Sequence, residues 1–297
     1  MRRLIAIAAA LAIAGFSFLL WPRQGAIVIP ENLASSDEGM EARGAYLTAA
    51  AGCLSCHWDK KNGGEPFAGG RAIESPFGTF YAPNITPDRQ TGIGDWSDQE
   101  FVEALLHGIG REGENLYPSL PFASYAGMTI EDALAIKAYL MTQPPVRREN
   151  RTHNIDLLLM WRPLISGWRL FFFDGPVAET EMHAMSRGAY LVEVLGHCGE
   201  CHTPRNFLGG PDDARAFGGA RLGESAAPNI TPHADGIGSW SRDELVTFLK
   251  DGTTPDFDVA GGEMAEVIAH GTSKLTDEDR AAMADYLRAL APQAGKP

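Results

Sequence analysis

The stretch GCLSCHW, at residues 52–58, places two cysteines two residues apart and a histidine directly after the second. The same order returns as HCGECHT at residues 197–203. Two thiols at this spacing can add to the two vinyl groups of one haem, and the histidine that follows is then placed to bind the iron from the same side. The two copies therefore predict two covalently attached haem c groups.

Six residues of these motifs carry the predicted chemistry. They are Cys53, Cys56 and His57 for the first haem, and Cys198, Cys201 and His202 for the second. A zinc site and a redox-active dithiol are the alternatives. A zinc site would have to join ligands from two halves of the chain, and a thioredoxin-like dithiol belongs in a βαβ context that this sequence lacks. All four cysteines of the chain lie in the two motifs, so none is left to link distant segments.

The sequence around the motifs is also repeated. Three blocks recur in the same order, and they are 43–57 with 187–202, 82–101 with 227–245, and 128–140 with 275–287. Two long copies indicate a duplicated domain rather than an array of short repeats. The prolines of QPPV, at residues 143–146, cannot continue a helix and end the first copy. We therefore predict domains at residues 38–146 and 181–292, joined by a linker at 147–180.

Each half reads as helices joined by long loops. Capping-box patterns, in which a glutamate follows a serine by three residues, begin at Ser35, Ser97 and Ser241. Apolar residues at helical spacing follow, as they also do after Thr129 and Thr276 in the last helix of each half. Strand signals are few. The sequence therefore predicts an all-α fold of two small tandem domains.

The N-terminus has the character of a membrane-targeting segment. Arg2 and Arg3 precede an apolar run from Leu4 to Trp21 that is long enough to span a bilayer. Bulky residues at its end leave no small-x-small cleavage site, so we favour a signal anchor at residues 1–24 over a cleaved signal peptide. Either interpretation places the rest of the chain on the periplasmic side of a bacterial inner membrane, because the two arginines stay in the cytoplasm.

The charge of the chain limits its partners. The formal net charge is −13 over 297 residues. A nucleic-acid partner would require clustered lysine and arginine, so this class of partner is excluded. An acidic surface suits docking to a basic patch on another protein, although it also serves solubility.

The segment between the domains, at residues 154–176, is apolar but interrupted. Two arginines, Arg162 and Arg169, would be expensive inside hydrocarbon, so a second membrane span is disfavoured. Two interpretations stay open. The segment is either a linker packed across both domains or a stretch that docks to a membrane surface or a partner.

The sixth ligand of each iron decides between a carrier and an open site, because His and Met together make a stable electron carrier of raised potential. In the second half we predict Met264, in a glycine-flanked loop before the last helix. In the first half we predict Met128, at the mouth of the last helix, since Met141 is too near the end of that helix. A structural core methionine is the alternative for both residues, and an open iron is a further one in the first half.

A wider set of motifs carries a resemblance to a known group. These are CLSCH, APNITPD…GIGDWS and LYPSLPFASYAGM in the first half, and CGECHTPRN, APNITP…GIGSWS and GEMAEVIAHGTSKLT in the second. The sequence resembles the dihaem cytochrome c proteins that serve periplasmic dehydrogenases. These include the cytochrome subunits of alcohol, gluconate and sorbitol dehydrogenases, and the partners of molybdenum-containing aldehyde and isoquinoline oxidoreductases. The resemblance covers about residues 42–290 and implies two cytochrome c domains of class I type.

This sequence departs from part of the group. Many alcohol-dehydrogenase cytochromes carry the ligand methionine at the position of Leu120, and relatives without it tend to have one at the position of Met128. In the second half Leu275 matches Met128, and Met264 supplies the sulfur earlier. The alcohol-dehydrogenase subunits also usually carry a third haem domain that this sequence lacks, which favours the dihaem partners of other dehydrogenases.

The resemblance implies that the two APNITP…GIG.W blocks form walls of the haem pockets. Trp96 and Trp240 are candidates to donate an indole N–H to a haem propionate, with plain core packing as an equal alternative. Arg71 and Arg221 follow glycines and are candidates to neutralise propionates, although arginine is more often simply exposed.

These features together predict an electron-transfer protein. It would carry electrons from a periplasmic dehydrogenase to a downstream cytochrome or oxidase of the respiratory chain, and would perform no bond chemistry itself. The alternative is a dihaem enzyme such as a peroxidase or a thiosulfate dehydrogenase. Such an enzyme needs an iron that is open or ligated by His or Cys, whereas this chain offers a methionine for each haem and no spare cysteine.

Overall fold

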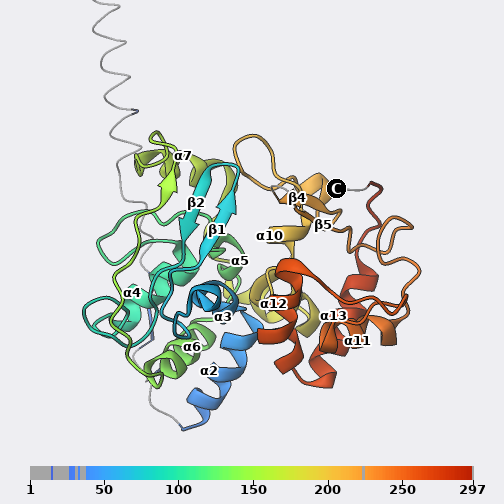
Figure 1. The fold of residues 1–297 in the computed structure, drawn as a ribbon, viewed down its shortest axis with the longest axis horizontal. Helices are drawn as coiled ribbons and strands as arrows, with labels where there is room; N and C mark the ends of the chain where they lie inside the picture. The colour runs from blue at the N-terminus through green and yellow to red at the C-terminus, as the bar shows by residue number, and fades with distance from the viewer. Residues whose placement is uncertain (1–14, 16–26, 31–32, 34–37, 223–224, 296–297) are drawn as a thin grey trace, which may run out of the picture.

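The computed structural model describes residues 15, 27–30, 33, 38–222 and 225–295. Apart from residue 15, the predicted signal anchor lies outside these residues, as does the predicted cap at Ser35. The described chain forms two helical halves that lie side by side (Figure 1). The proposed boundaries at 38–146, 147–180 and 181–292 stay predictions.

In the first half, α2 packs along α6, and α4 also contacts α6. The helical elements of this half are α2 (Glu38–Ala50), α3 (Cys53–His57), η1 (Lys60–Asn62), α4 (Asp98–Val102), η2 (Glu103–His107), α5 (Phe122–Tyr125) and α6 (Ile130–Met141). Its strands are β1 (Ala72–Ser75) and β2 (Gly78–Tyr81).

The second half repeats this plan, with α13 packed against α9, η3 and α11. Its helical elements are α8 (Glu179–Ala184), α9 (Arg187–Ala189), η3 (Tyr190–Leu195), α10 (Gly199–His202), η4 (Asp213–Arg215), α11 (Arg242–Asp251), α12 (Gly262–His270), η5 (Thr272–Lys274) and α13 (Asp277–Ala289). Its strands are β4 (Ala220–Leu222) and β5 (Ser225–Ala227).

The predicted helix starts are confirmed where the structure describes them. Both predicted boxes form, because Ser97 and Ser241 each accept a hydrogen bond from the backbone N–H three residues on and the glutamate there bonds back. Thr129 and Thr276 cap α6 and α13 in the same way, by accepting from the backbone N–H groups of Asp132 and Asp279.

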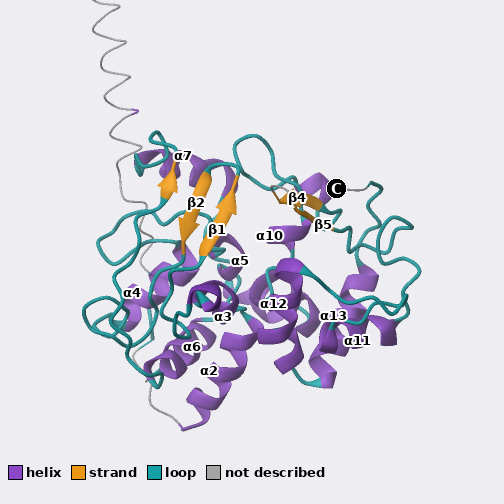
Figure 2. Ribbon diagram, in the orientation of Figure 1, coloured by secondary structure: helices purple, strands orange, loops and turns teal. Residues whose placement is uncertain are grey.

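Helices dominate the fold (Figure 2), but the all-α prediction missed two small antiparallel sheets. One has the order β1-β2-β3, in which β3 (Asn154–Ile155) comes from the predicted linker, and the other is the β4-β5 hairpin. The β1-β2 turn depends on Gly78, whose φ of 111° is open to glycine but strained for other residues. A Cβ there would also lie 2.4 Å from the Asn154 carbonyl oxygen.

Apolar residues of both halves form one continuous core. Leu47, Met128 and Leu134 come from the first half, and Leu191 and Met283 from the second. Each of these side chains is at most 3% exposed. The two halves are therefore not separate globules but share a hydrophobic interior.

The predicted linker packs mainly on the first half. Its helix α7 (Pro163–Phe172) is held by Arg162, which donates to the Asn115 carbonyl, and by Arg169, which donates to the His107 carbonyl. It reaches the second half as well, since a Cβ at Gly210 would lie 2.3 Å from the Phe172 ring. This agrees with a linker packed across both domains.

The outward side of this linker is apolar. Its exposed large hydrophobic residues are Leu157, Leu158, Met160, Trp161, Leu164, Leu170 and Phe171. The docking interpretation of the segment therefore stays open as a prediction. No helix among the described residues is both long and apolar enough to cross a membrane.

Candidate haem-binding sites

The first cysteine motif is a short helix of its own. Gly52, with φ of 63°, turns the chain so that α3 starts at Cys53 and ends at His57. In the second half α10 runs from Gly199 to His202, directly after Cys198. All four thiols are free. Each motif thus presents two unpaired sulfurs and an imidazole within about one helical turn.

The thiols are poor candidates for a redox dithiol. Burial raises the pKa of Cys53 and of Cys198 to about 12. A disulfide-exchanging pair needs a thiol whose pKa lies below its usual value, because the thiolate is the nucleophile. The zinc alternative also lacks support, because no three His, Cys, Asp or Glu side chains in the described part of the chain gather closely enough to hold a metal ion.

Both motif histidines are oriented in the same way. The Nδ1 atom of His57 lies 2.7 Å from the Pro83 carbonyl oxygen, and that of His202 lies 2.7 Å from the Pro228 carbonyl oxygen. A carbonyl can only accept, so Nδ1 carries the proton and Nε2 keeps its lone pair for a metal. Burial also lowers the pKa of both imidazoles, which favours the neutral form that ligates iron.

A glycine in each half lies between the motif histidine and the proline that orients it. The N–H of Gly69 donates to the His57 carbonyl at 2.9 Å, and the N–H of Gly219 donates to the His202 carbonyl at 2.8 Å. Gly69 has φ of 70°, and a Cβ there would lie 2.4 Å from the backbone of Pro83. Only glycine therefore lets the loop approach the proline that positions the imidazole.

The Asn-Ile-Thr residues of the repeated block join two segments of each half by hydrogen bonds. The side-chain oxygen of Asn84 accepts from the backbone and hydroxyl of Thr86, and its amide donates to the Val146 carbonyl at 2.7 Å. Asn229 does the same with Thr231 and with the carbonyl of Gln293, also at 2.7 Å. These hydrogen bonds attach the loop of each histidine-orienting proline to the segment that follows the last helix of its half.

Sequence reasoning identified the block but missed this role. It expected the APNITP segments to wall the haem, and did not identify the Pro83 and Pro228 carbonyls as partners of the histidines. A signal was present, because each of these prolines follows its histidine by 26 residues. Equal spacing in two copies indicates a contact that both copies keep.

The two predicted methionine ligands lie in different environments. Met128 immediately precedes the Thr129 cap of α6 and is 1% exposed, packed among core residues of the first half. Met264 is half-buried and lies in the first turn of α12, not in the loop that the sequence predicted. Their roles as ligands stay predictions.

The four candidate propionate partners differ in burial and in hydrogen-bond partners. Trp96 and Trp240 are half-buried against the core, and neither indole N–H has a hydrogen-bond acceptor among the described residues. Arg71 lies at the first motif, where it donates to the Ser55 carbonyl and pairs with Glu263 of the second half. Arg221 is exposed. A propionate role is therefore still open for the tryptophans, whereas Arg71 already has partners.

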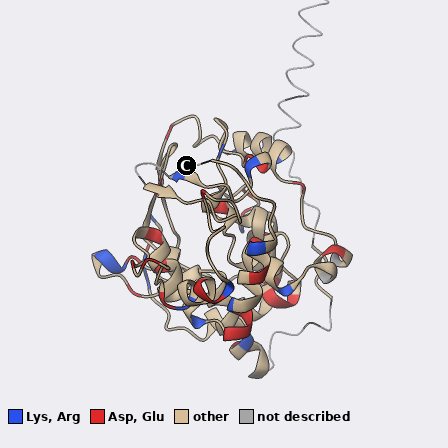
Figure 3. Cartoon of the chain, turned by 90° about the vertical axis from the view of Figure 1, so that its right-hand side faces the viewer, with Lys and Arg blue, Asp and Glu red and all other residues tan. Residues whose placement is uncertain are grey.

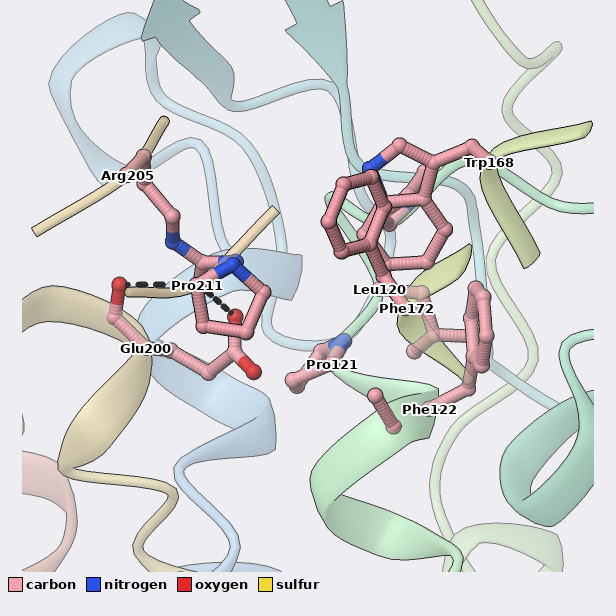
Figure 4. Close-up of a pocket in the computed structure, with 10 residues that line it drawn as sticks. Leu120, Pro121, Phe122, Trp168, Phe172, Glu200, Arg205 and Pro211 are labelled. Atoms are coloured by element: carbon pink, nitrogen blue, oxygen red, sulfur yellow. Dashed lines mark hydrogen bonds and ion pairs between the residues drawn. The ribbon is translucent and has the colours of Figure 1, made fainter. Parts of the chain in front are cut away.

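The donor set fits a covalently attached haem in each half. Two free thiols, an imidazole with Nε2 unengaged and a methionine in the same half are the groups that a c-type haem with His and Met ligation requires. The second motif also borders a small pocket between α5, α7 and the loop after α10 (Figure 4). Its cavity volume is about 30 Å³, space for one or two waters.

Comparison with known proteins also finds two repeats in the chain. The family model described as "Cytochrome c" matches residues 41–144 and again 186–291. A protein described as "Diheme cytochrome c-type" from Cereibacter sphaeroides is 40% identical over 299 residues. That alignment covers 97% of this chain and 98% of the relative.

Subunits of named dehydrogenases are also similar. The gluconate 2-dehydrogenase cytochrome c subunit of Pantoea cypripedii is 39% identical, over 86% of this chain and 60% of the relative. The fructose dehydrogenase cytochrome subunit of Gluconobacter japonicus is 40% identical, over 88% of this chain and 54% of the relative. The chain thus spans little more than half the length of these two dehydrogenase subunits.

Proposed function

Because the chain belongs to the cytochrome c family, we propose that it is a dihaem electron carrier that accepts electrons from a periplasmic dehydrogenase and passes them toward the respiratory chain. The two matched repeats and the dihaem relative give it two haem c groups. Each haem, when bound, supplies one-electron Fe(III)/Fe(II) chemistry. The dehydrogenase relatives are cytochrome subunits by name, so the alternative of a dihaem enzyme is set aside.

The observation that carries this proposal is the repeated histidine geometry. In each half an imidazole is fixed by a carbonyl 26 residues on, beside two free thiols. Such an orienting hydrogen bond holds the ring and the tautomer in place, so the ligand does not rearrange when the oxidation state changes. Met128 and His202 are buried, so bulk water is kept from one predicted ligand of each iron, which suits a carrier better than an enzyme that must admit a substrate.

The partners follow from the relatives and the charge. The donor is a dehydrogenase subunit, and the acceptor is a downstream cytochrome or oxidase. The net charge of −13 favours basic docking surfaces on these partners. Acidic and basic residues are interspersed over the helices in Figure 3. Residues 1–24 would hold the chain at the periplasmic face of the inner membrane.

One experiment on the sixth ligands of the haem irons distinguishes an electron carrier from an enzyme. The ferric holoprotein should show the near-infrared absorption band of methionine-ligated haem. Met128→Ala and Met264→Ala should each remove about half of its strength, because each would deprive one iron of sulfur. Met141→Ala is the matched control, since Met141 is 39% exposed at the end of α6. High-spin iron in the unmodified protein would refute the carrier.

The dehydrogenase itself can be sought by affinity capture from detergent-solubilised membranes. A captured dehydrogenase should reduce the haem absorption bands of this chain when its own substrate is added, and not when the substrate is withheld. Reduction of the haems by thiosulfate instead, or catalytic oxidation of the reduced haems by hydrogen peroxide, would contradict the proposal.

A further inference from the structure

The RGAY segments of the two halves make matching ion pairs inside their own half. Arg43 pairs with Asp132 of α6 at 2.5 Å, and Arg187 pairs with Asp279 of α13 at 2.6 Å. Each aspartate is also the third residue of its helix and donates its backbone N–H to the capping threonine. The arginine thus ties the start of one repeat to the last helix of the same repeat.

The tyrosines of the same segments donate hydrogen bonds to the other half. The hydroxyl of Tyr46 donates to Asp279 of the second half at 2.5 Å, and that of Tyr190 donates to Asp132 of the first half at 2.5 Å. Each aspartate therefore forms an ion pair with an arginine of its own half and accepts a hydrogen bond from a tyrosine of the other. The exchange is reciprocal, as in an interface related by a two-fold axis.

One glycine in each half lets the halves approach closely. A Cβ at Gly127 would lie 2.7 Å from the Val194 side chain, and a Cβ at Gly271 would lie 3.2 Å from the Ala49 carbonyl oxygen. Gly127 belongs to the first half and Val194 to the second, whereas Gly271 and Ala49 have the opposite order. Each half therefore contributes one glycine that lies close to the other half.

The haem-binding motifs lie at this same contact. Ser55, inside the first motif, donates to the Glu266 carbonyl of α12 at 3.3 Å, and Glu200, inside the second, accepts from Ser124 of the first half at 3.1 Å. Each motif therefore makes a direct hydrogen bond to the opposite half.

We propose that Tyr46 and Tyr190, through Asp279 and Asp132, are positioning residues that fix the two haem-binding motifs relative to each other. This inference rests on the proposed function, because the rate of electron exchange between two fixed groups depends steeply on their separation. Neither tyrosine belongs to a motif, and each acts only through an aspartate of the opposite half. The hydroxyls set the relation between the halves, whereas the shared core and the helix caps stabilise the fold as a whole.

The test uses the holoprotein and circular dichroism in the Soret region. Two haems held close in a fixed orientation give a bisignate couplet there, whose strength depends on their distance and angle. Tyr46→Phe and Tyr190→Phe should each weaken the couplet, and the double variant should lose at least half of it. The absorption spectrum should not change, because no ligand is altered.

Tyr286→Phe is the matched control. The hydroxyl of Tyr286 also donates to a carboxylate, that of Glu193, but both residues belong to the second half. This variant should keep the full couplet. Far-UV circular dichroism confirms that every variant is folded.

The outcomes separate this inference from the proposed function. A protein without haem absorption would refute the proposed function itself. Normal absorption with no couplet in the unmodified protein, or with a full couplet in the double variant, would overturn only the positioning role. An equal loss in Tyr286→Phe would overturn it too, because the effect would then not depend on the contact between halves.

Discussion

At the scale of single residues, Asp279 makes the stability of the protein depend on pH. Hydrogen bonds from Arg187, together with one from Tyr46, lower its pKa below the ordinary value of 3.8. A carboxyl whose folded pKa lies below its unfolded pKa adds stability that is fully present above the unfolded value and is lost as the pH falls through the folded one. We therefore expect Asp279→Asn to reduce the free energy of unfolding by about 1 kcal/mol at neutral pH. The difference from the unmodified protein should shrink below pH 3.8.

Urea unfolding between neutral and acid pH measures this difference, with Asp285→Asn as the control. Asp285 also forms a two-point pair, with Arg242, at 2.7 Å and 3.2 Å. Its side chain is 59% exposed, against 14% for Asp279, so solvent screens it more and its loss should matter less. Equal losses in the two variants, or a difference that does not depend on pH, would show that the position of Asp279 between the halves is irrelevant.

At the scale of elements, the caps decide where helices begin. Ser241 accepts from the Glu244 backbone at 3.2 Å, and the Glu244 carboxylate bonds back to the Ser241 backbone at 2.7 Å. Ser241→Ala leaves a backbone donor of α11 without this acceptor and should lower the free energy of unfolding by about 1 kcal/mol. Urea denaturation measures the change. Ser273→Ala removes an exposed hydroxyl that donates to the Ala269 carbonyl and begins no helix, so its effect should stay within about 0.5 kcal/mol.

Local chemistry made these helix starts predictable, and long-range packing made other elements unpredictable. The caps at Ser97, Ser241, Thr129 and Thr276 depend on residues three positions apart, which a sequence displays directly. Helix α12 has no capping side chain, and glycines flank it, so the sequence suggested a loop around Met264. It is helical because it packs on α3 and α11, elements from both halves of the chain. The β2-β3 pairing likewise joins residues 78–79 to 154–155 and has no local signal.

At the scale of the whole molecule, the repeat predicted the duplication but not the contact between the copies. The motif residues, their spacing and the recurring blocks follow from the sequence because covalent attachment requires a fixed local order. The reciprocal bonds of Tyr46 and Tyr190 join residues 233 and 58 positions away. Their polar partners are ordinary surface residue types in the sequence. Only the folded chain shows that the two RGAY segments meet across one interface.

The shared core predicts that both halves unfold together. Leu134 of the first half and Met283 of the second belong to one cluster of buried residues and are 0% and 1% exposed. Replacing either by alanine should remove about 2–5 kcal/mol, by lost burial and the cavity left behind. Because the core is continuous, each variant should lower the urea midpoint of both halves by the same amount.

Hydrogen exchange followed by mass spectrometry reads the two halves separately and therefore tests this cooperativity. Peptides from α6 and from α13 should lose protection at one common urea concentration in the holoprotein, and that concentration should move equally in Leu134→Ala and Met283→Ala. Val259→Ala is the control, since its side chain is 69% exposed and should leave the midpoint unchanged. Two transitions, of which each variant moves only its own, would mean that the halves are independent domains joined by a weak contact. Tyrosine–aspartate bonds could not then hold the haem-binding motifs in a fixed relation.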